Sequence, residues 1–277
     1  MTRIGIMAAI TFREAARKKV LWMALAAGVA FLVLFATGLH FQIGAFGDRP
    51  VRSFIRQQAI SGLLMVGMYA LDLLVVVITI LVSVDTLSGE IGSGTIQAIA
   101  TKPVRRSELL LGKWLGFAGM LTLFIAFLVF GIDGITRVMT GVTARHLPQG
   151  FSLIWLESML LLSVTLFLGT YFSALTSGVI ALGLHGVAFL GGWIEQGGAL
   201  THTQKAVDAG IVASIVMPSE SLWRRAAFEM QSPLASAIHF SPFSAASVPS
   251  PAMIVYAALY ALVFLLLAMR RLQTRDL

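Results

Sequence analysis

The sequence predicts an all-α, polytopic membrane protein that crosses the bilayer six times. Its 277 residues are 57% hydrophobic and only 12% charged, whereas soluble domains usually carry about 25% charged residues. The apolar residues gather in six long runs that lack the period-two alternation typical of β-strands. Since lipid cannot hydrogen-bond an open backbone, each run is expected to be a helix.

The six runs have about the length that a membrane-spanning helix requires. A helix needs roughly 17 to 25 residues to cross about 30 Å of hydrocarbon. The spans are expected at residues 21–41, 60–84, 114–135, 153–175, 179–194 and 252–269. The fifth is the shortest, so its helix is expected to extend into the region from Gly191 to Trp193 or to stop short.

Basic residues in the connections predict the orientation. The first set of connections comprises residues 1–20, 85–113, 176–178 and 270–277, and the second comprises residues 42–59, 136–152 and 195–251. The first set holds 12 of the 20 Lys and Arg residues although it is the shorter set. By the positive-inside rule, both termini are expected in the cytoplasm, together with residues 85–113.

The N-terminal segment, residues 1–20, is expected to form an amphipathic helix on the inner membrane surface. Arg13 and Arg17 share one side of its helical wheel, and Ile4, Ala8 and Phe12 share the other. The net charge of +7 is attributed to basic residues at the ends of the spans, where they contact anionic lipid headgroups. No nucleic-acid partner is therefore expected.

Composition also argues against catalysis in this chain. The absence of cysteine excludes thiolate metal sites and Cys nucleophiles. There is no His-Glu-x-x-His pair and no Ser nucleophile elbow, so neither a metal site nor a catalytic residue is expected.

A polar, basic island at residues 85–113 separates spans two and three. Its distinguishing residues are Gly89-Glu90, Gly94-Thr95, Lys102-Pro103-Val104, Arg106 and the run from Glu108 to Lys113. This pattern resembles the permeases of the type-two ABC exporter family. Within the family it looks most like the compact six-span group that includes the permease of the nitrous oxide reductase maturation transporter. The basic tail at 270–277 and residues 218–226 are similar to further family elements.

The resemblance implies a permease that works with a separate motor. Family members dimerise, and each subunit lays the connection between spans two and three on a cytoplasmic ATPase. We therefore expect a homodimer, or a dimer with a close relative, bound to two ATPase copies in a bacterial inner membrane. ATP and Mg are expected on the ATPase, because neither Gly89 to Gly94 nor Gly112-Lys113 has the spacing of a phosphate-binding loop.

The island contains the expected coupling helix. Ile91, Ile96 and Ile99 offer an apolar anchor for a groove on the partner. Glycines 89, 92 and 94 are expected to break the helix of span two, and Pro103 to end the docking segment before a rigid helix begins near Arg105. The alternative is a solvated loop. The candidate ATPase-coupling residues are Glu90, Gly94, Thr95, Ile96, Ile99, Lys102, Pro103, Arg105 and Arg106.

Two ionisable residues are predicted inside the membrane. Asp72 falls near the middle of span two and His185 near the middle of span five, where such groups are costly and often functional. Asp72 is expected to face the dimer interior, with His185 as a possible partner, or to be a packing residue. Asp133, Glu157 and Glu195 are expected near outer span ends, solvated at the interface.

Residues 195–251 are expected to form short helices in the outer interface. Ser219 is expected to cap one of them, with an apolar stripe through Trp223 opposite Arg224. Trp223, Arg224 and Arg225 are the candidate outer gate, within a lid that controls substrate exit or contacts an extracytoplasmic partner.

Three functions remain open for this single permease domain, residues 1–277. The first is ATP-driven export of an amphiphilic molecule. The second is mechanical transmission from the ATPase to an extracytoplasmic protein. The third is a proton-coupled secondary transporter using Asp72, although inverted repeats are not visible in the sequence.

Overall fold

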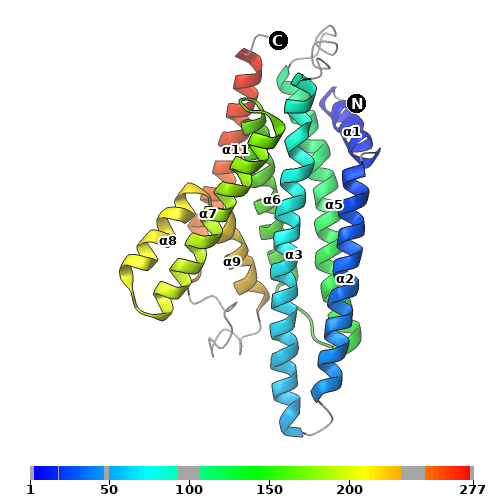
Figure 1. Ribbon diagram of the computed structural model, residues 1–277, viewed down its shortest axis with the longest axis vertical. Helices are drawn as coiled ribbons and strands as arrows, with labels where there is room; N and C mark the ends of the chain where they lie inside the picture. The colour runs from blue at the N-terminus through cyan, green and yellow to red at the C-terminus, as the bar shows by residue number, and fades with distance from the viewer. Residues whose placement is uncertain (1–2, 18, 47–49, 93–105, 232–246, 275–277) are drawn as a thin grey trace.

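The computed structural model describes residues 3–17, 19–46, 50–92, 106–231 and 247–274, which are almost entirely helical (Figure 1). The helices are α1 (Arg3–Arg17), α2 (Lys19–Phe46), α3 (Pro50–Gly92), α5 (Arg106–Thr140), α6 (Leu147–Gly169), α7 (Ala174–Leu200), α8 (Gln204–Val216), α9 (Ser219–Met230) and α11 (Pro251–Thr274). No strand occurs in these ranges. The all-α prediction is confirmed.

Six of the helices are long and apolar enough to cross a membrane: α2, α3, α5, α6, α7 and α11. They form one elongated bundle, and α1 begins and α11 ends at the same end of it, the upper end in Figure 1. Helix α6 lies at the centre, because it packs against α3, α5, α7, α9 and α11. The six predicted spans therefore each correspond to one helix of the bundle.

The helix boundaries differ from the expected ones in two places that matter below. Helix α7 has 27 residues, so the fifth span extends well past the Gly191 region. Helix α6 begins at Leu147 and ends at Gly169, several residues earlier than expected at both ends. This shift moves Glu157 from the predicted outer end to the middle of the helix.

Helix α3 is much longer than a membrane-spanning helix needs to be. Its 43 residues correspond to about 65 Å at 1.5 Å per residue. Of the three glycines expected to break this helix, Gly89 lies inside it, Gly92 is its last residue, and Gly94 lies outside the described residues. A single glycine lowers helix stability by only about 1 kcal/mol, which a long continuous helix tolerates.

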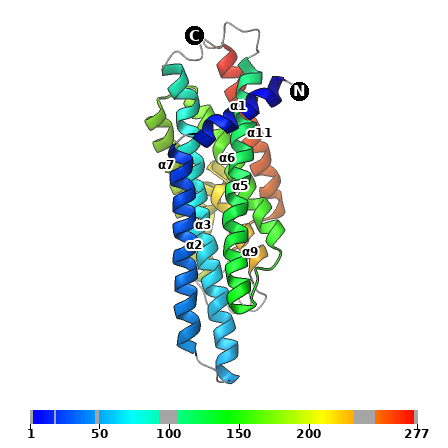
Figure 2. The ribbon, with the colours of Figure 1, turned by 90° about the vertical axis from the view of Figure 1, so that its right-hand side faces the viewer.

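The predicted N-terminal helix is present and crosses the bundle at the upper end, where α1 packs on α5 (Figure 2). The two backbones approach closely at Gly112 and Gly116 of α5. A Cβ atom at Gly116 would lie 2.8 Å from the carbonyl oxygen of Ala8, so only glycine fits this crossing. The small-residue spacing of α5 thus serves contact with α1.

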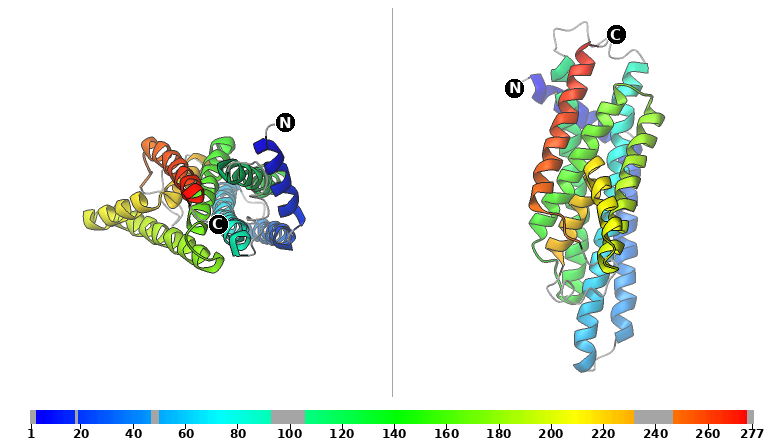
Figure 3. Two further views of the ribbon diagram at one scale, coloured as in Figure 1. Left: turned by 90° about the horizontal axis from the view of Figure 1, so that it is seen from above. Right: turned by 90° about the vertical axis from the view of Figure 1, so that its left-hand side faces the viewer.

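Two short helices, α8 and α9, lie between spans five and six as predicted, but α9 does not lie on the surface. Helix α8 turns back along α7 at the edge of the molecule, and α9 then descends inside the bundle against α6 (Figures 1 and 3). Most of α9 is buried, including Trp223 and Arg224. Residues 204–230 therefore form a re-entrant element that returns to mid-bundle.

Candidate functional site

The centre of the bundle holds an acid cluster, defined here as Asp72, Glu157 and Glu220. Asp72 lies near the middle of α3 and Glu157 near the middle of α6, with exposed fractions of 5% and 1%. The side chains of Asp72 and Glu157 interact electrostatically with each other. Among the described residues, no N–H or O–H donor reaches Asp72 Oδ1 or either carboxyl oxygen of Glu157.

Helices α7 and α9 bring two further polar groups to Glu157. His185 Nδ1 lies 3.9 Å from Glu157 Oε1 and 3.0 Å from Ser219 Oγ, with which it shares a hydrogen bond. Ser219 is the first residue of α9, so this bond fixes the start of the re-entrant helix to the middle of α7. The expected capping role of Ser219 is not observed, since Pro218 occupies the N-cap position without a side-chain cap.

Glu220, in the first turn of α9, completes the cluster. A Cβ atom at Gly192 of α7 would lie 2.7 Å from Glu220 Cγ, so the glycine makes room for this side chain. Burial raises the pKa of Glu220 well above its usual range, the negative charge of Asp72 raises it further, and Arg224 partly opposes this. Glu220 is therefore protonated over a wider pH range than an exposed glutamate.

An aromatic group lies against the cluster on the α3 side. The ring of Tyr69, almost one turn before Asp72, packs edge-on against Trp223 of α9, with 5.3 Å between the ring centroids. Trp193 Nε1 donates a hydrogen bond to the Tyr69 hydroxyl over 3.0 Å. These contacts connect α3, α7 and α9 and enclose the acid cluster on this side.

A buried ion pair fixes α9 to α7 nearer the lower end of the bundle. Arg224 Nη2 lies 2.8 Å from Glu195 Oε2, and the two side chains are 2% and 6% exposed. Arg224 also donates to Ser214 of α8 over 3.2 Å, and Ser247 donates to the other oxygen of Glu195. The predictions of a solvated Glu195 and of an Arg224 opposite the buried stripe are wrong, because each of the two charges neutralises the other inside the bundle.

Tyrosines of α11 support the end of α8, where the chain turns within the bundle. The hydroxyl of Tyr256 donates to the carbonyl oxygen of Ile215 over 2.6 Å, and that of Tyr260 donates to Val216 over 2.9 Å. The last carbonyl groups of a helix have no intrahelical donor. Lipid cannot supply one, so these hydroxyls make the mid-bundle turn possible.

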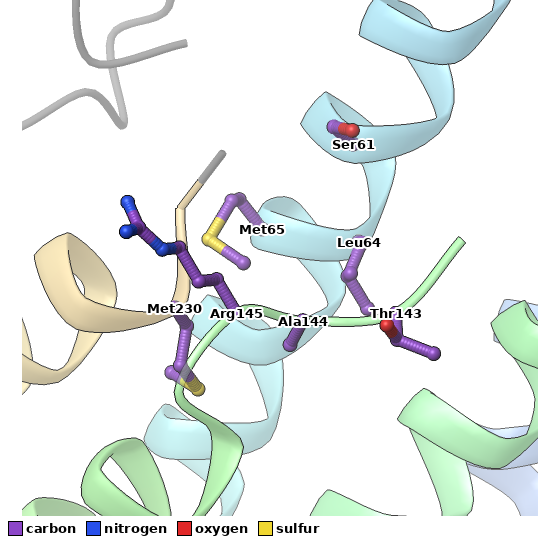
Figure 4. Close-up of a pocket in the computed structure, with 7 residues that line it drawn as sticks. All are labelled: Ser61, Leu64, Met65, Thr143, Ala144, Arg145 and Met230. Atoms are coloured by element: carbon purple, nitrogen blue, oxygen red, sulfur yellow. The ribbon is translucent and has the colours of Figure 1, made fainter. Parts of the chain in front are cut away.

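A separate cavity of about 440 Å³ lies toward the lower end. Its lining residues come from α3, from the connection between α5 and α6, and from the end of α9 (Figure 4). The lining residues are Ser61, Leu64, Met65, Thr143, Ala144, Arg145 and Met230. The cavity is mainly apolar with one cation at its rim, and it shares no residue with the acid cluster.

The structure brings Asp72 and His185 into one site, but through intermediate residues. His185 contacts Glu157 and Ser219, and Glu157 contacts Asp72. Glu157 was missed because the expected span placed it at the outer end. Glu220 carries no sequence signal, since it lies in a connection that only the tertiary fold returns to the bundle.

The outer-gate residues do not act as one surface group. Trp223 and Arg224 are buried. Arg225 Nη2 pairs with Glu229 Oε1 at 2.7 Å in a partly exposed position. Trp223 and Arg224 contact other helices and fix α9 in the bundle, whereas the Arg225–Glu229 pair lies within α9.

The coupling candidates fall mostly outside the described residues. These are Gly94, Thr95, Ile96, Ile99, Lys102, Pro103 and Arg105. Glu90 lies in the last turns of α3, and Arg106 is the first residue of α5. The expected rigid helix that begins near Arg105 is confirmed, because α5 runs unbroken from Arg106 to Thr140.

The cluster does not have the geometry of a metal site. In the part of the chain that the structure describes, no three His, Cys, Asp or Glu side chains converge closely enough to hold a metal ion. The site therefore presents carboxyl groups, a histidine and hydroxyls to one another in a buried environment.

Comparison with known proteins agrees with this architecture. No curated protein matches the chain. The sequence profile described as ABC-2 family transporter protein matches residues 5–277, and so covers all six spans, the island and the re-entrant element. The chain belongs to the ABC-2 family of transporters.

Proposed function

We propose that this chain is the membrane subunit of an ATP-driven exporter that moves an amphiphilic molecule out of the cytoplasm. Family membership makes it a permease subunit of an ABC transporter that works with a cytoplasmic ABC ATPase. Beyond family membership, we propose that transport is outward and that the substrate is amphiphilic. We also propose that the chain forms a homodimer with two ATPase copies in a bacterial inner membrane, and that the ATPase binds ATP and Mg.

One observation carries the proposal: the connection between spans two and three leads directly into a continuous helix. Helix α5 has 35 residues and begins at Arg106, within the island. Helix α1 packs across the start of α5, so a displacement of the island moves both helices. A rigid helix transmits such a displacement along the bundle, toward the central helix α6 against which it packs.

Export of an amphiphilic molecule fits the surfaces of the bundle. Many large apolar side chains of α2, α7 and α11 are exposed, among them Leu34, Val179 and Val255. Lipid or a second permease copy can cover such faces, and an amphiphile in the bilayer reaches them directly.

A second candidate function is force transmission to an extracytoplasmic protein. Helices α2 and α3 form a hairpin that extends below the other helices in Figure 1. This projection offers a partner protein a contact surface beyond the bundle. A reconstituted complex that hydrolyses ATP but moves no solute would favour this candidate over export.

The coupling part of the proposal is tested by co-purification in mild detergent. The double variant Ile96→Asp/Ile99→Asp removes the apolar anchor, so we expect it to lose the ATPase and ATP-stimulated transport. The control Val138→Asp introduces a charge at an exposed apolar position near the far end of α5 and is expected to retain both. If the double variant keeps the ATPase with full stimulated hydrolysis, the island is not the docking segment.

A further inference from the structure

We propose that the acid cluster is a proton-binding site, and that its protons keep the re-entrant helix α9 docked in the bundle. The inference concerns this chain alone and does not rest on the export assignment. It differs from proton-driven transport, because the protons stabilise one conformation of an ATP-driven permease.

The first step is the contact between Asp72 and Glu157. The two side chains interact electrostatically, and they are only 5% and 1% exposed. The described protein groups supply no donor to Asp72 Oδ1 or to Glu157 Oε1 and Oε2. Two neighbouring ionised carboxylates without donors are costly in a buried site, so the pair is expected to retain a proton.

The second step is the shortage of positive charge around the cluster. Among the residues that the structure describes, the ionisable groups facing it are Tyr69 of α3, His185 of α7, and Arg224 of α9. Arg224 already pairs with Glu195 at 2.8 Å, and His185 Nδ1 is hydrogen-bonded to Ser219. No metal geometry exists among the described side chains. Protons are the remaining cations that can neutralise three carboxyl groups.

The third step links these protons to the position of α9. Glu220 enters the cluster only because α9 is docked, with its Cγ over Gly192 of α7. Loss of protons would place several negative charges together in a buried site, and undocking of α9 would relieve this. Since docking raises the pKa of Glu220 through burial, docking is most stable at low pH. This stability is lost as the pH rises through the docked-state pKa.

The fourth step is a further buried polar group on the face of α3 that carries Asp72. Thr79 follows Asp72 by seven residues, which is nearly two helical turns, and so lies on the same face of α3. Its side chain is fully buried, and its Oγ1 has no hydrogen-bond partner within the described structure. Thr79 therefore offers a free hydroxyl between the cluster and the upper end of the bundle.

Infrared spectroscopy of the purified chain in lipid nanodiscs tests the protonation directly. We expect a band from protonated carboxyl groups at neutral pH that disappears or weakens in Asp72→Asn/Glu157→Gln/Glu220→Gln. These amides keep the shape of protonated acids, so the variant is expected to fold. The control Asp208→Asn alters an exposed acid of α8 and should leave the band intact. An unchanged band in the triple variant would overturn the proposal.

Cysteine labelling tests the link to α9, and the cysteine-free chain makes it specific. A thiol introduced by Ala227→Cys lies in the buried part of α9. We expect its labelling by a maleimide to increase with pH more steeply in the parent background than in Glu157→Gln/Glu220→Gln. Comparison of the same thiol in both backgrounds removes the intrinsic pH dependence of the reagent. Identical pH profiles would show that protonation does not keep α9 docked. The infrared experiment tests the protonation of the cluster independently of this result.

Discussion

The buried pair of Arg224 and Glu195 offers the sharpest quantitative prediction. Replacement of Arg224 by Ala leaves the Glu195 carboxylate inside the bundle, where Ser247 is its remaining hydrogen-bond donor among the described contacts. Breaking a buried ion pair by removing one partner costs about 3–5 kcal/mol. Both side chains are at least nine-tenths buried, so we expect the upper part of this range.

The neighbouring arginine provides a matched control. Arg225 pairs with Glu229 at 2.7 Å, but the two side chains are 22% and 19% exposed. Partly exposed pairs one helical turn apart contribute about 1 kcal/mol or less. Arg225→Ala is therefore expected to lower the free energy of unfolding several-fold less than Arg224→Ala, although the two positions are adjacent in the same helix.

Thermal unfolding in detergent, followed by circular dichroism, measures the difference. For a chain of this size, 1 kcal/mol shifts Tm by roughly 2–4 °C, so Arg224→Ala should lower Tm by on the order of 10 °C. The double variant Glu195→Gln/Arg224→Met removes both charges and should recover most of the loss. Equal shifts for Arg224→Ala and Arg225→Ala would refute the assignment of a buried clamp.

Two further predictions concern the upper end and the orientation of the bundle. Gly116→Leu should separate α1 from α5 and lower Tm, because even a Cβ atom there would lie 2.8 Å from the Ala8 carbonyl oxygen. The control Gly134→Leu, at a position in α5 with nothing within 4 Å, should change Tm little. Equal Tm shifts for the two variants would contradict a close crossing of α1 and α5. Single cysteines at Ser107 and Thr143 should be labelled only from the cytoplasm and only from outside, respectively, in intact cells, and the reverse pattern would overturn the orientation.

Much of the fold could be predicted from the sequence because each membrane span is defined locally. Long apolar runs force helices in lipid, and all six expected spans are present. The errors occurred where the amphipathic pattern of a helix did not show whether its polar side faces solvent or the interior of the bundle. Arg224 suggested a solvated face, but Glu195 neutralises it inside the bundle.

The acid cluster shows why the site was only half predictable. Asp72 was identifiable, since a carboxyl group in the middle of an apolar run is costly at about 2.5–3.5 kcal/mol. Glu157 required the correct helix boundary, and a shift of six residues at the start of α6 decides whether it lies at an end or in the centre. Glu220 required the path of the chain after span five.

The sequence alone determined the class of protein, the number of spans, the N-terminal helix and the basic island, because hydrophobicity, charge and helix length act within short stretches of chain. The tertiary structure decided that α1 packs on α5 and that residues 204–230 return to mid-bundle. It also decided that three acids from α3, α6 and α9 meet there. These contacts join residues far apart along the chain, and their energies depend on which charges and hydroxyl groups the fold places opposite one another.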